Sequence, residues 1–166
     1  MGYEIVNSVA VEFDTNLNHE RDDPSDSHIS IHTNGTGANS TEESLSLGVF
    51  NAPDQAIQDG NVHTAKISYM PGVLDVYFDN LTTPVITATI DLDANLNLDG
   101  GQAWVGFTAA TGGGWSNHDI LNWQFTSLAD TTPVVAIGDA GQLEGDSGQS
   151  PLEFPVTVTR PDAAGP

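Results

Sequence analysis

Residues 64–79 read TAKISYMPGVLDVYFD, which is two short runs on either side of Pro71-Gly72. Within each run, apolar residues alternate with polar ones, the period expected of a strand with one buried face. A proline followed by a glycine is a strong turn signal, because proline fixes its own φ and glycine tolerates positive φ. The stretch therefore predicts a β-hairpin with arms at 64–70 and 73–79.

The sequence on both sides of this hairpin has the same texture. Short apolar runs are separated by Gly, Pro, Asn and Asp, and no long helical pattern occurs. The region 33–61 is rich in turn residues and is expected to be mostly loop. Evenly spaced short strands favour an all-β antiparallel β-sandwich. The further candidate strands are 7–14, 28–33, 84–91, 102–108 and 120–126.

The sequence beyond residue 127 differs from what precedes it. Residues 128–132 are typical of a linker, and residues 133–166 predict two strands with an acidic, glycine-rich turn between them. Two strands alone cannot bury a core. The segment EGDSG at 144–148 resembles the opening of a Calx-β repeat. We therefore expect one domain over 1–127, a linker at 128–132, and the first strands of a second β-repeat at 133–166.

The net charge of the chain is −20, from 23 acidic residues and only three basic ones. Nucleic acids and anionic membranes are bound through Lys and Arg, so neither is an expected partner. Cations are expected partners, since hard ions such as Ca²⁺ prefer oxygen ligands. With no cysteine, disulfides and thiolate metal sites are excluded. No apolar run is long enough for a membrane helix, and the start of the chain does not resemble a signal peptide.

The run Val9-Ala10-Val11-Glu12-Phe13-Asp14 places two carboxylates on one strand face. Glu12 and Asp14 repel each other there, and their burial is costly unless a cation lies between them. Asn18, Asp23 and His28 follow closely and add oxygen ligands and one imidazole. Oxygen ligands suit Ca²⁺, and a mixed oxygen and nitrogen set suits Mn²⁺ or a similar transition ion.

The spacing E-F-D-T-x-x-N, then D-P and H, resembles the metal-binding loop of legume-type (L-type) lectins. This resemblance implies a concanavalin-like jelly-roll sandwich that binds Ca²⁺ and Mn²⁺. It implies that Glu12 and His28 ligate the transition ion, that Asp14 and Asp23 bridge both ions, and that calcium also takes the Asn16 carbonyl and the Asn18 side chain. The implied metal ligands are thus Glu12, Asp14, Asn16, Asn18, Asp23 and His28.

The resemblance also implies a sugar site. Legume lectins usually carry an aromatic residue at the position of Asn16, so the sugar-stacking ring is missing there. Residues 104–123 resemble the last strands of that family and the loop between them, where Gly113, Gly114 and Trp115 are expected to contact sugar together with Asn18. Trp104 and Trp123 alternate with apolar residues on the predicted strands and are expected in the core.

Gly2-Tyr3-Glu4 resembles the family segment just before the metal strand, so the resemblance covers residues 2–127. We expect the opening strands of the domain, with one acidic sugar-binding residue, to lie upstream of this chain. The predicted function is calcium-dependent carbohydrate binding within a larger extracellular or cell-surface protein.

Two other functions fit parts of the pattern. Some glycoside hydrolases with a similar sandwich need a third acid after Glu12 and Asp14, but residues 16 and 17 are Asn and Leu. Without a nucleophile and acid pair, no enzyme activity is expected. A structural adhesin module, in which metal only rigidifies the fold, shares the metal residues and differs by binding no sugar.

Overall fold

The computed structural model describes residues 4–53, 56–110, 117–127, 134–137 and 156–159. All pairings between its strands are antiparallel. The strands are β1 (Val9–Asp14), β2 (His28–Thr33), β3 (Gly48–Asn51), β4 (Ala65–Met70), β5 (Gly72–Phe78), β6 (Ile86–Ile90), β7 (Val134–Ile137) and β8 (Val156–Thr159). The described helices are short: η1 (His19–Arg21), η2 (Glu43–Leu45) and α1 (Leu92–Asn95). None of them is long and apolar enough to cross a membrane.

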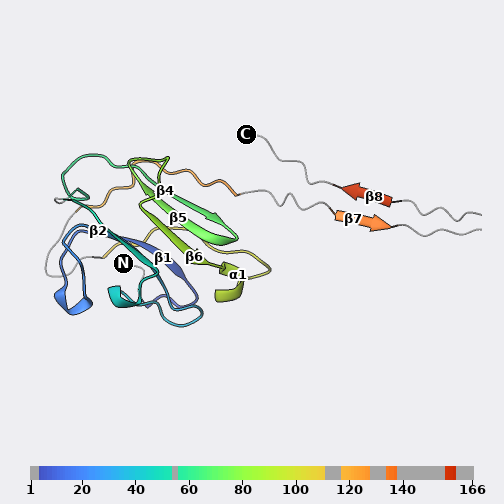
Figure 1. The fold of residues 1–166 in the computed structure, drawn as a ribbon, viewed down its shortest axis with the longest axis horizontal. Helices are drawn as coiled ribbons and strands as arrows, with labels where there is room; N and C mark the ends of the chain where they lie inside the picture. Colours follow the sequence, from blue (N-terminus) through green and yellow to red (C-terminus); the bar gives the residue numbers. More distant parts are fainter. Residues whose placement is uncertain (1–3, 54–55, 111–116, 128–133, 138–155, 160–166) are drawn as a thin grey trace, which may run out of the picture. The chain divides into compact units, whose positions relative to one another are not determined.

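Two three-stranded sheets form the sandwich, in the orders β1-β2-β3 and β4-β5-β6 (Figure 1). Ile29 and Ile31 of β2 are fully buried and belong to the same core cluster as side chains of β5 and β6. The β5 and β6 members of that cluster are Leu74, Val76, Ile86, Ala88 and Ile90. Burial of these aliphatic side chains is the main force that holds the sheets together. The predicted all-β antiparallel sandwich is confirmed.

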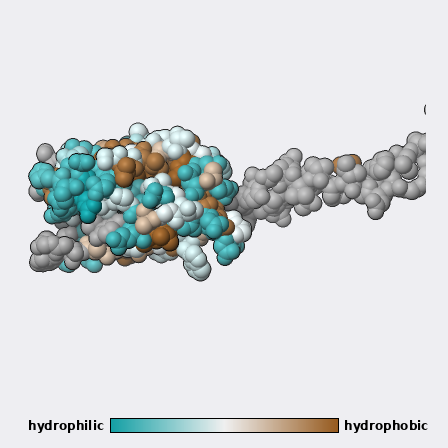
Figure 2. Space-filling model, turned by 90° about the horizontal axis from the view of Figure 1, so that it is seen from below, coloured by the Kyte–Doolittle hydropathy of each residue, from teal (hydrophilic) through white to brown (hydrophobic). Residues whose placement is uncertain are grey.

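The hairpin predicted at 64–79 is β4 and β5. Its register pairs Tyr69 with Leu74 and Met70 with Val73, so the turn lies at Pro71-Gly72 as expected. Gly72 has a φ of +92°, a conformation that favours glycine. On the face drawn in Figure 2, hydrophobic side chains form separate patches among hydrophilic ones.

β3 was not predicted, because it lies inside the region 33–61 that was expected to be mostly loop. It pairs with β2, and Gly48 approaches β6 so closely that an added Cβ would lie 2.7 Å from Cγ2 of Ile86. Real Cβ atoms essentially never make contacts this short. Glycine here therefore allows the end of one sheet to approach the other, a role that a glycine inside a strand often has.

The strands predicted at 102–108 and 120–126 were wrong, since residues 103–110 and 117–127 have no strand in the structure. Trp104 is 102% exposed and Trp123 is 53% exposed, so their predicted core positions were also wrong. The apolar alternation is typical of a strand. However, a strand forms only where a neighbouring strand satisfies its backbone groups, and the structure assigns no strand partner to these two segments.

The chain divides into two compact units, Met1–His118 and Asp119–Pro166. The second unit contains the two strands expected after residue 132, and β7 and β8 pair with each other. Whether they begin a Calx-β-like repeat stays a prediction, as do the domain bounds at 127 and 132.

Candidate metal centre

Strand β2 is buried on both of its faces. Its residues alternate between aliphatic and polar, and all of them from His28 to His32 are buried. Ile29 and Ile31 belong to the core, whereas His28, Ser30 and His32 lie on the opposite face of the sheet. Buried polar side chains require partners, and the partners here come from β1 and from the segment that contains η2.

The register of β1 and β2 brings the predicted acids to this polar face. Asp14 lies opposite His28, and Glu12 lies opposite Ser30. Because both acids have the same parity on β1, their side chains share the face of the two histidines. Strand pairing alone therefore assembles two carboxylates beside two imidazoles.

The first cluster consists of Asp14, Asp23 and His28, each of which offers a ligand atom within 4.8 Å of the others. The loop between β1 and β2 returns Asp23 to the strand end. The backbone N–H of Asn18 donates to Oδ2 of Asp23 over 2.6 Å, and the N–H of Asn16 donates to Oδ1 of Asp14 over 2.7 Å. Between Asn18 and Asp23, the chain turns through η1 and through Asp22, whose backbone is in the left-handed conformation.

Asn16 and Asn18 lie at the rim of this cluster. The side-chain amide of Asn16 donates to Oδ1 of Asn18 over 3.1 Å. Burial raises the pKa values of both Asp14 and Asp23, an effect that their backbone hydrogen bonds oppose. Two partly buried carboxylates with raised pKa values are a suitable place for a cation, which removes the cost of their mutual repulsion.

The second cluster consists of Glu12, His32 and Glu43, again with ligand atoms within 4.8 Å of one another. Nε2 of His32 lies 3.3 Å from Oε2 of Glu12, 3.1 Å from Oε1 of Glu43 and 2.8 Å from Oγ of Ser30. Nε2 of His28 lies 3.4 Å from the same Glu43 oxygen. Glu43 thus contacts both histidines and connects the two clusters.

The charges in this face are strongly coupled. Burial alone would lower the pKa of His32, but its bonds to Glu12 and Glu43 raise it to about 9. Burial would raise the pKa of Glu43, but its two histidine partners lower it to about 2. The pKa of His28 is also raised, because the Glu43 carboxylate and the Ser25 carbonyl outweigh burial.

Three buried side-chain atoms of this face have no hydrogen-bond partner among the described residues. They are Oε1 of Glu12, Nε2 of His28 and Oε2 of Glu43. Orphaned buried polar atoms are uncommon and call for an explanation such as an ion. Carboxylate oxygens and one imidazole nitrogen are the donors that a transition ion such as Mn²⁺ accepts, so the residues fit such an ion.

The structure therefore groups the predicted ligands in part. Asp14, Asp23 and His28 lie together, and Asn16 and Asn18 lie in the loop beside them. Glu12 lies with His32 and Glu43 instead. Gly113, Gly114 and Trp115 lie outside the described residues. Ion binding by the six predicted ligands and sugar binding by the predicted sugar residues both stay predictions.

Sequence reasoning missed His32 and Glu43. A signal for His32 was available, because His28, Ser30 and His32 alternate with isoleucines and share one strand face. Glu43 had no such signal. It reaches the site through the loop before β3 and through η2, and neither element has a period that predicts its position.

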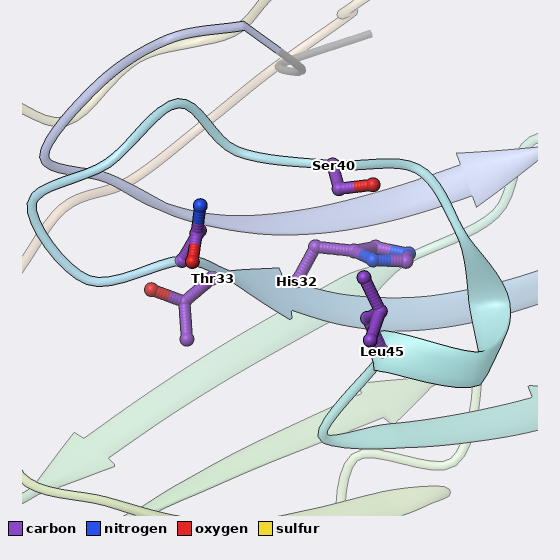
Figure 3. Close-up of a pocket in the computed structure, with 5 residues that line it drawn as sticks. His32, Thr33, Ser40 and Leu45 are labelled. Atoms are coloured by element: carbon purple, nitrogen blue, oxygen red, sulfur yellow. The ribbon is translucent and has the colours of Figure 1, made fainter.

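A shallow hollow lies beside His32. It is lined by His32, Thr33, Asn34, Ser40 and Leu45. Figure 3 shows the His32 ring between the side chains of Ser40 and Leu45. His32 is only 3% exposed, so little of it is accessible from this hollow.

Comparison with known families gives a clear match. The model of the legume lectin domain matches residues 2–138 of this chain, which is most of its length. The chain belongs to the legume lectin family. This lectin-family membership agrees with the resemblance of the β1–β2 loop and with the antiparallel two-sheet fold. The legume lectin domain is not an enzyme domain.

Several curated lectins are similar to this legume lectin chain. Agglutinin-2 of Cladrastis kentukea is 33% identical over 126 residues, covering 72% of this chain and 38% of the relative. The 2-acetamido-2-deoxy-D-galactose-binding seed lectin 2 of Cytisus scoparius is 32% identical over 138 residues, covering 75% and 49%.

A third relative is a probable L-type lectin-domain containing receptor kinase, S.7, of Arabidopsis thaliana. It is 31% identical over 128 residues, covering 70% of this chain and 18% of the relative. The lectin chain described here thus spans less than half the length of each of these relatives. No solved structure matches it significantly.

Proposed function

We propose that this chain binds carbohydrate in a calcium-dependent manner and does no chemistry on the sugar. The observation that carries the proposal is the convergence of Asp14, Asp23 and His28 at the end of the β1–β2 pair, with Asn16 and Asn18 beside them. Membership of the legume lectin family supports it, as do relatives whose names describe lectins.

In this proposal, Ca²⁺ takes Asp14, Asp23, the Asn16 carbonyl and Oδ1 of Asn18. Glu12 and His28 would hold Mn²⁺ or a similar ion, and Asp14 and Asp23 would be ligands of both ions. The donor types support this division, because Ca²⁺ prefers oxygen ligands and imidazole suits transition ions. Nδ1 of His28 lies 3.0 Å from the Ser25 carbonyl oxygen. A carbonyl can only accept, so Nδ1 carries a proton and Nε2 is the nitrogen left to ligate the ion.

Calcium would supply the positioning of protein groups. Oδ1 of Asn18 would hold the ion, which would leave the amide NH₂ of Asn18 to donate to a sugar hydroxyl. Gly113, Gly114 and Trp115 complete the sugar site in this proposal. A glycine allows close approach of backbone N–H groups, and a tryptophan ring packs against sugar C–H groups.

The affinity for a single sugar is expected to be weak, about millimolar. Each hydroxyl-protein hydrogen bond replaces one with water, so a shallow site gains little per contact. We also propose an extracellular or cell-surface location, which the seed lectin and receptor kinase relatives support.

The test is a glycan array probed with multivalent chain, since several weak sites on one scaffold raise the apparent affinity. Binding is expected in Ca²⁺ and Mn²⁺ and not after chelation. Asn18→Ala and Trp115→Ala should each reduce it. Asn61→Ala is the matched control, because the Asn61 side chain donates to Asp59 and lies outside both acidic clusters. A metal-loaded chain that binds no glycan would favour the structural-module function instead.

A further inference from the structure

The polar face of the β1–β2–β3 sheet contains two residues that the lectin loop motif does not assign. These are His32, at the end of β2, and Glu43, in η2. Both are buried, at 3% and 8% exposure. A buried glutamate is rare unless it is paired with a positive charge or binds a metal. Glu43 pairs with His32 through Oε1, so what still requires a cause is the burial of its second oxygen, Oε2.

The orphaned atoms indicate that cause. Each carboxylate of this cluster has one oxygen near Nε2 of His32, namely Oε2 of Glu12 and Oε1 of Glu43. The other oxygen of each, Oε1 of Glu12 and Oε2 of Glu43, is buried without a hydrogen-bond partner among the described residues. Nε2 of His28 is the remaining orphan. Glu12, Glu43 and His28 thus each have one atom without a hydrogen-bond partner that could ligate an ion.

We propose that Glu43 is a direct ligand of the transition ion, together with Glu12 and His28, and that His32 positions the two glutamates. This inference rests on the transition-ion part of the proposed function and extends it by one ligand and one positioning residue. A histidine that bonds the second oxygen of a ligating carboxylate fixes the direction of the first, as residues around metal sites commonly do.

The charge balance supports the same arrangement. Glu12, Asp14, Asp23 and Glu43 carry four negative charges within two adjoining clusters. His32 supplies at most one positive charge, so the four acids are in excess. A calcium ion at the aspartate end and a transition ion at the glutamate end would offset this excess, which is otherwise costly to bury.

The proposal is tested by titrating the full chain with Mn²⁺ and with Ca²⁺ by calorimetry. Glu43→Gln should lower the Mn²⁺ affinity tenfold or more and leave the Ca²⁺ affinity within about twofold, because calcium lies at the aspartate end. Glu42→Gln is the matched control. Glu42 is the next residue along the chain, and its carboxylate pairs with Arg21. This control should bind both ions as the parent chain does.

His32→Ala should lower the Mn²⁺ affinity about tenfold without weakening Ca²⁺, whereas a general loss of structure would weaken both ions. The electron paramagnetic resonance spectrum of bound Mn²⁺ should change in Glu43→Asp, which keeps the charge but shortens the ligand. This variant serves if Glu43→Gln does not fold.

Equal Mn²⁺ affinity in Glu43→Gln and Glu42→Gln would overturn the proposal, as would an unchanged Mn²⁺ spectrum in Glu43→Asp. If the parent chain itself binds no transition ion, the proposed metal function fails together with this inference. If Mn²⁺ binds through Glu43 but no glycan is recognised, only the sugar part of the proposed function fails.

Discussion

Nε2 of His32 lies 3.1 Å from Oε1 of Glu43, although the two residues are eleven positions apart and come from a strand and a 3-10 turn. Both side chains are at least nine-tenths buried. The contact therefore fixes the segment that contains η2 over the polar face of β2. Together with Glu12 beside His32 and His28 beside Glu43, it holds the pKa of His32 at about 9 and that of Glu43 at about 2, so the pair is charged at neutral pH.

This contact should be measurable as a coupling energy. We expect His32→Ala and Glu43→Ala, made singly in chelator, to destabilise the chain by about 3 kcal/mol each, because each removes one of the two partners of a buried charge. The double variant should lose less than the sum of the single losses, with a coupling of about 0.5–3 kcal/mol. Urea unfolding of the four proteins measures it, and strictly additive losses would show that the contact is not energetically important.

Metal should stabilise the folded chain. Ions that bind only the native state raise its stability by mass action, by about 2.7 kcal/mol when free ion exceeds Kd a hundredfold. The melting temperature should therefore rise when Ca²⁺ is added and fall when a chelator is added. Scanning calorimetry of the same sample in both conditions checks this. A melting temperature that does not move in either condition would contradict the two-ion site.

Asp14 and His28 should differ in which ion they affect. Asp14→Ala removes one of the two carboxylates proposed to ligate both ions and should abolish binding of both. His28→Ala removes an imidazole, which is a poor calcium ligand, and should weaken only the transition ion. Separate calorimetric titrations with Ca²⁺ and Mn²⁺ test this, and equal losses of both ions in the His28 variant would show that the roles are wrongly assigned.

A second histidine cluster gives a pH prediction away from the metal face. Nδ1 of His63 lies 2.9 Å from Oδ2 of Asp79, and its Nε2 lies 2.9 Å from Oδ1 of Asp59. The bond to Asp79 is the main cause of a raised pKa for His63. A raised folded-state pKa adds stability that is complete below the unfolded value of about 6.5 and is lost as pH rises through the folded value.

The parent chain should therefore lose stability relative to His63→Gln as pH increases above 6.5. The two carboxyl pKa values are lowered, that of Asp59 to about 2. The same cluster should thus also lose stability below about pH 4, as these acids take up protons. Urea unfolding of both proteins between pH 3 and 9 checks the prediction. A stability difference between them that is constant over this range would contradict it.

Gly48 should tolerate no side chain. Because a Cβ there would lie 2.7 Å from Cγ2 of Ile86, Gly48→Ala forces the two sheets apart locally. A loss of about 1–3 kcal/mol is expected, as for other overpacked cores. Gly60→Ala is a control for the general effect of replacing glycine, since nothing lies within 4 Å of its added Cβ, although its φ of +82° adds strain of its own. Combining Gly48→Ala with Ile86→Val keeps Cγ2 and should not restore stability, whereas Ile86→Ala should relieve the clash.

The sequence pattern correctly predicted strands that pair with a neighbour close to them in the sequence. The alternation on either side of Pro71-Gly72 predicted β4 and β5, because both arms pair with each other. The same alternation around Trp104 and Trp123 gave wrong strands, since alternation describes a face but supplies no neighbour to pair with. β3 was missed because only four residues and its pairing with β2 define it.

The candidate site shows the same limit. The loop from Glu12 to His28 is continuous in sequence, so its spacing could be compared with a family motif, and the structure brings Asp14, Asp23 and His28 together. Glu43 enters from a separate loop, and its contact with His28 and His32 depends on how that loop folds back. The spacing of residues along the chain does not show that the loop containing Glu43 folds back onto this site.

Strand β2 separates two interiors of opposite chemistry, one aliphatic and one ionic. Alternate residues of this one strand line each of them. No position between His28 and His32 faces water freely, so each should tolerate few substitutions. The class of side chain that is excluded should alternate along the strand. A charge at Ile29 or Ile31 would be rejected by one side, and a hydrocarbon at His28 or His32 by the other. Any shift of this strand by one residue would exchange the two interiors at once, which makes its register one of the most strictly determined features of the molecule.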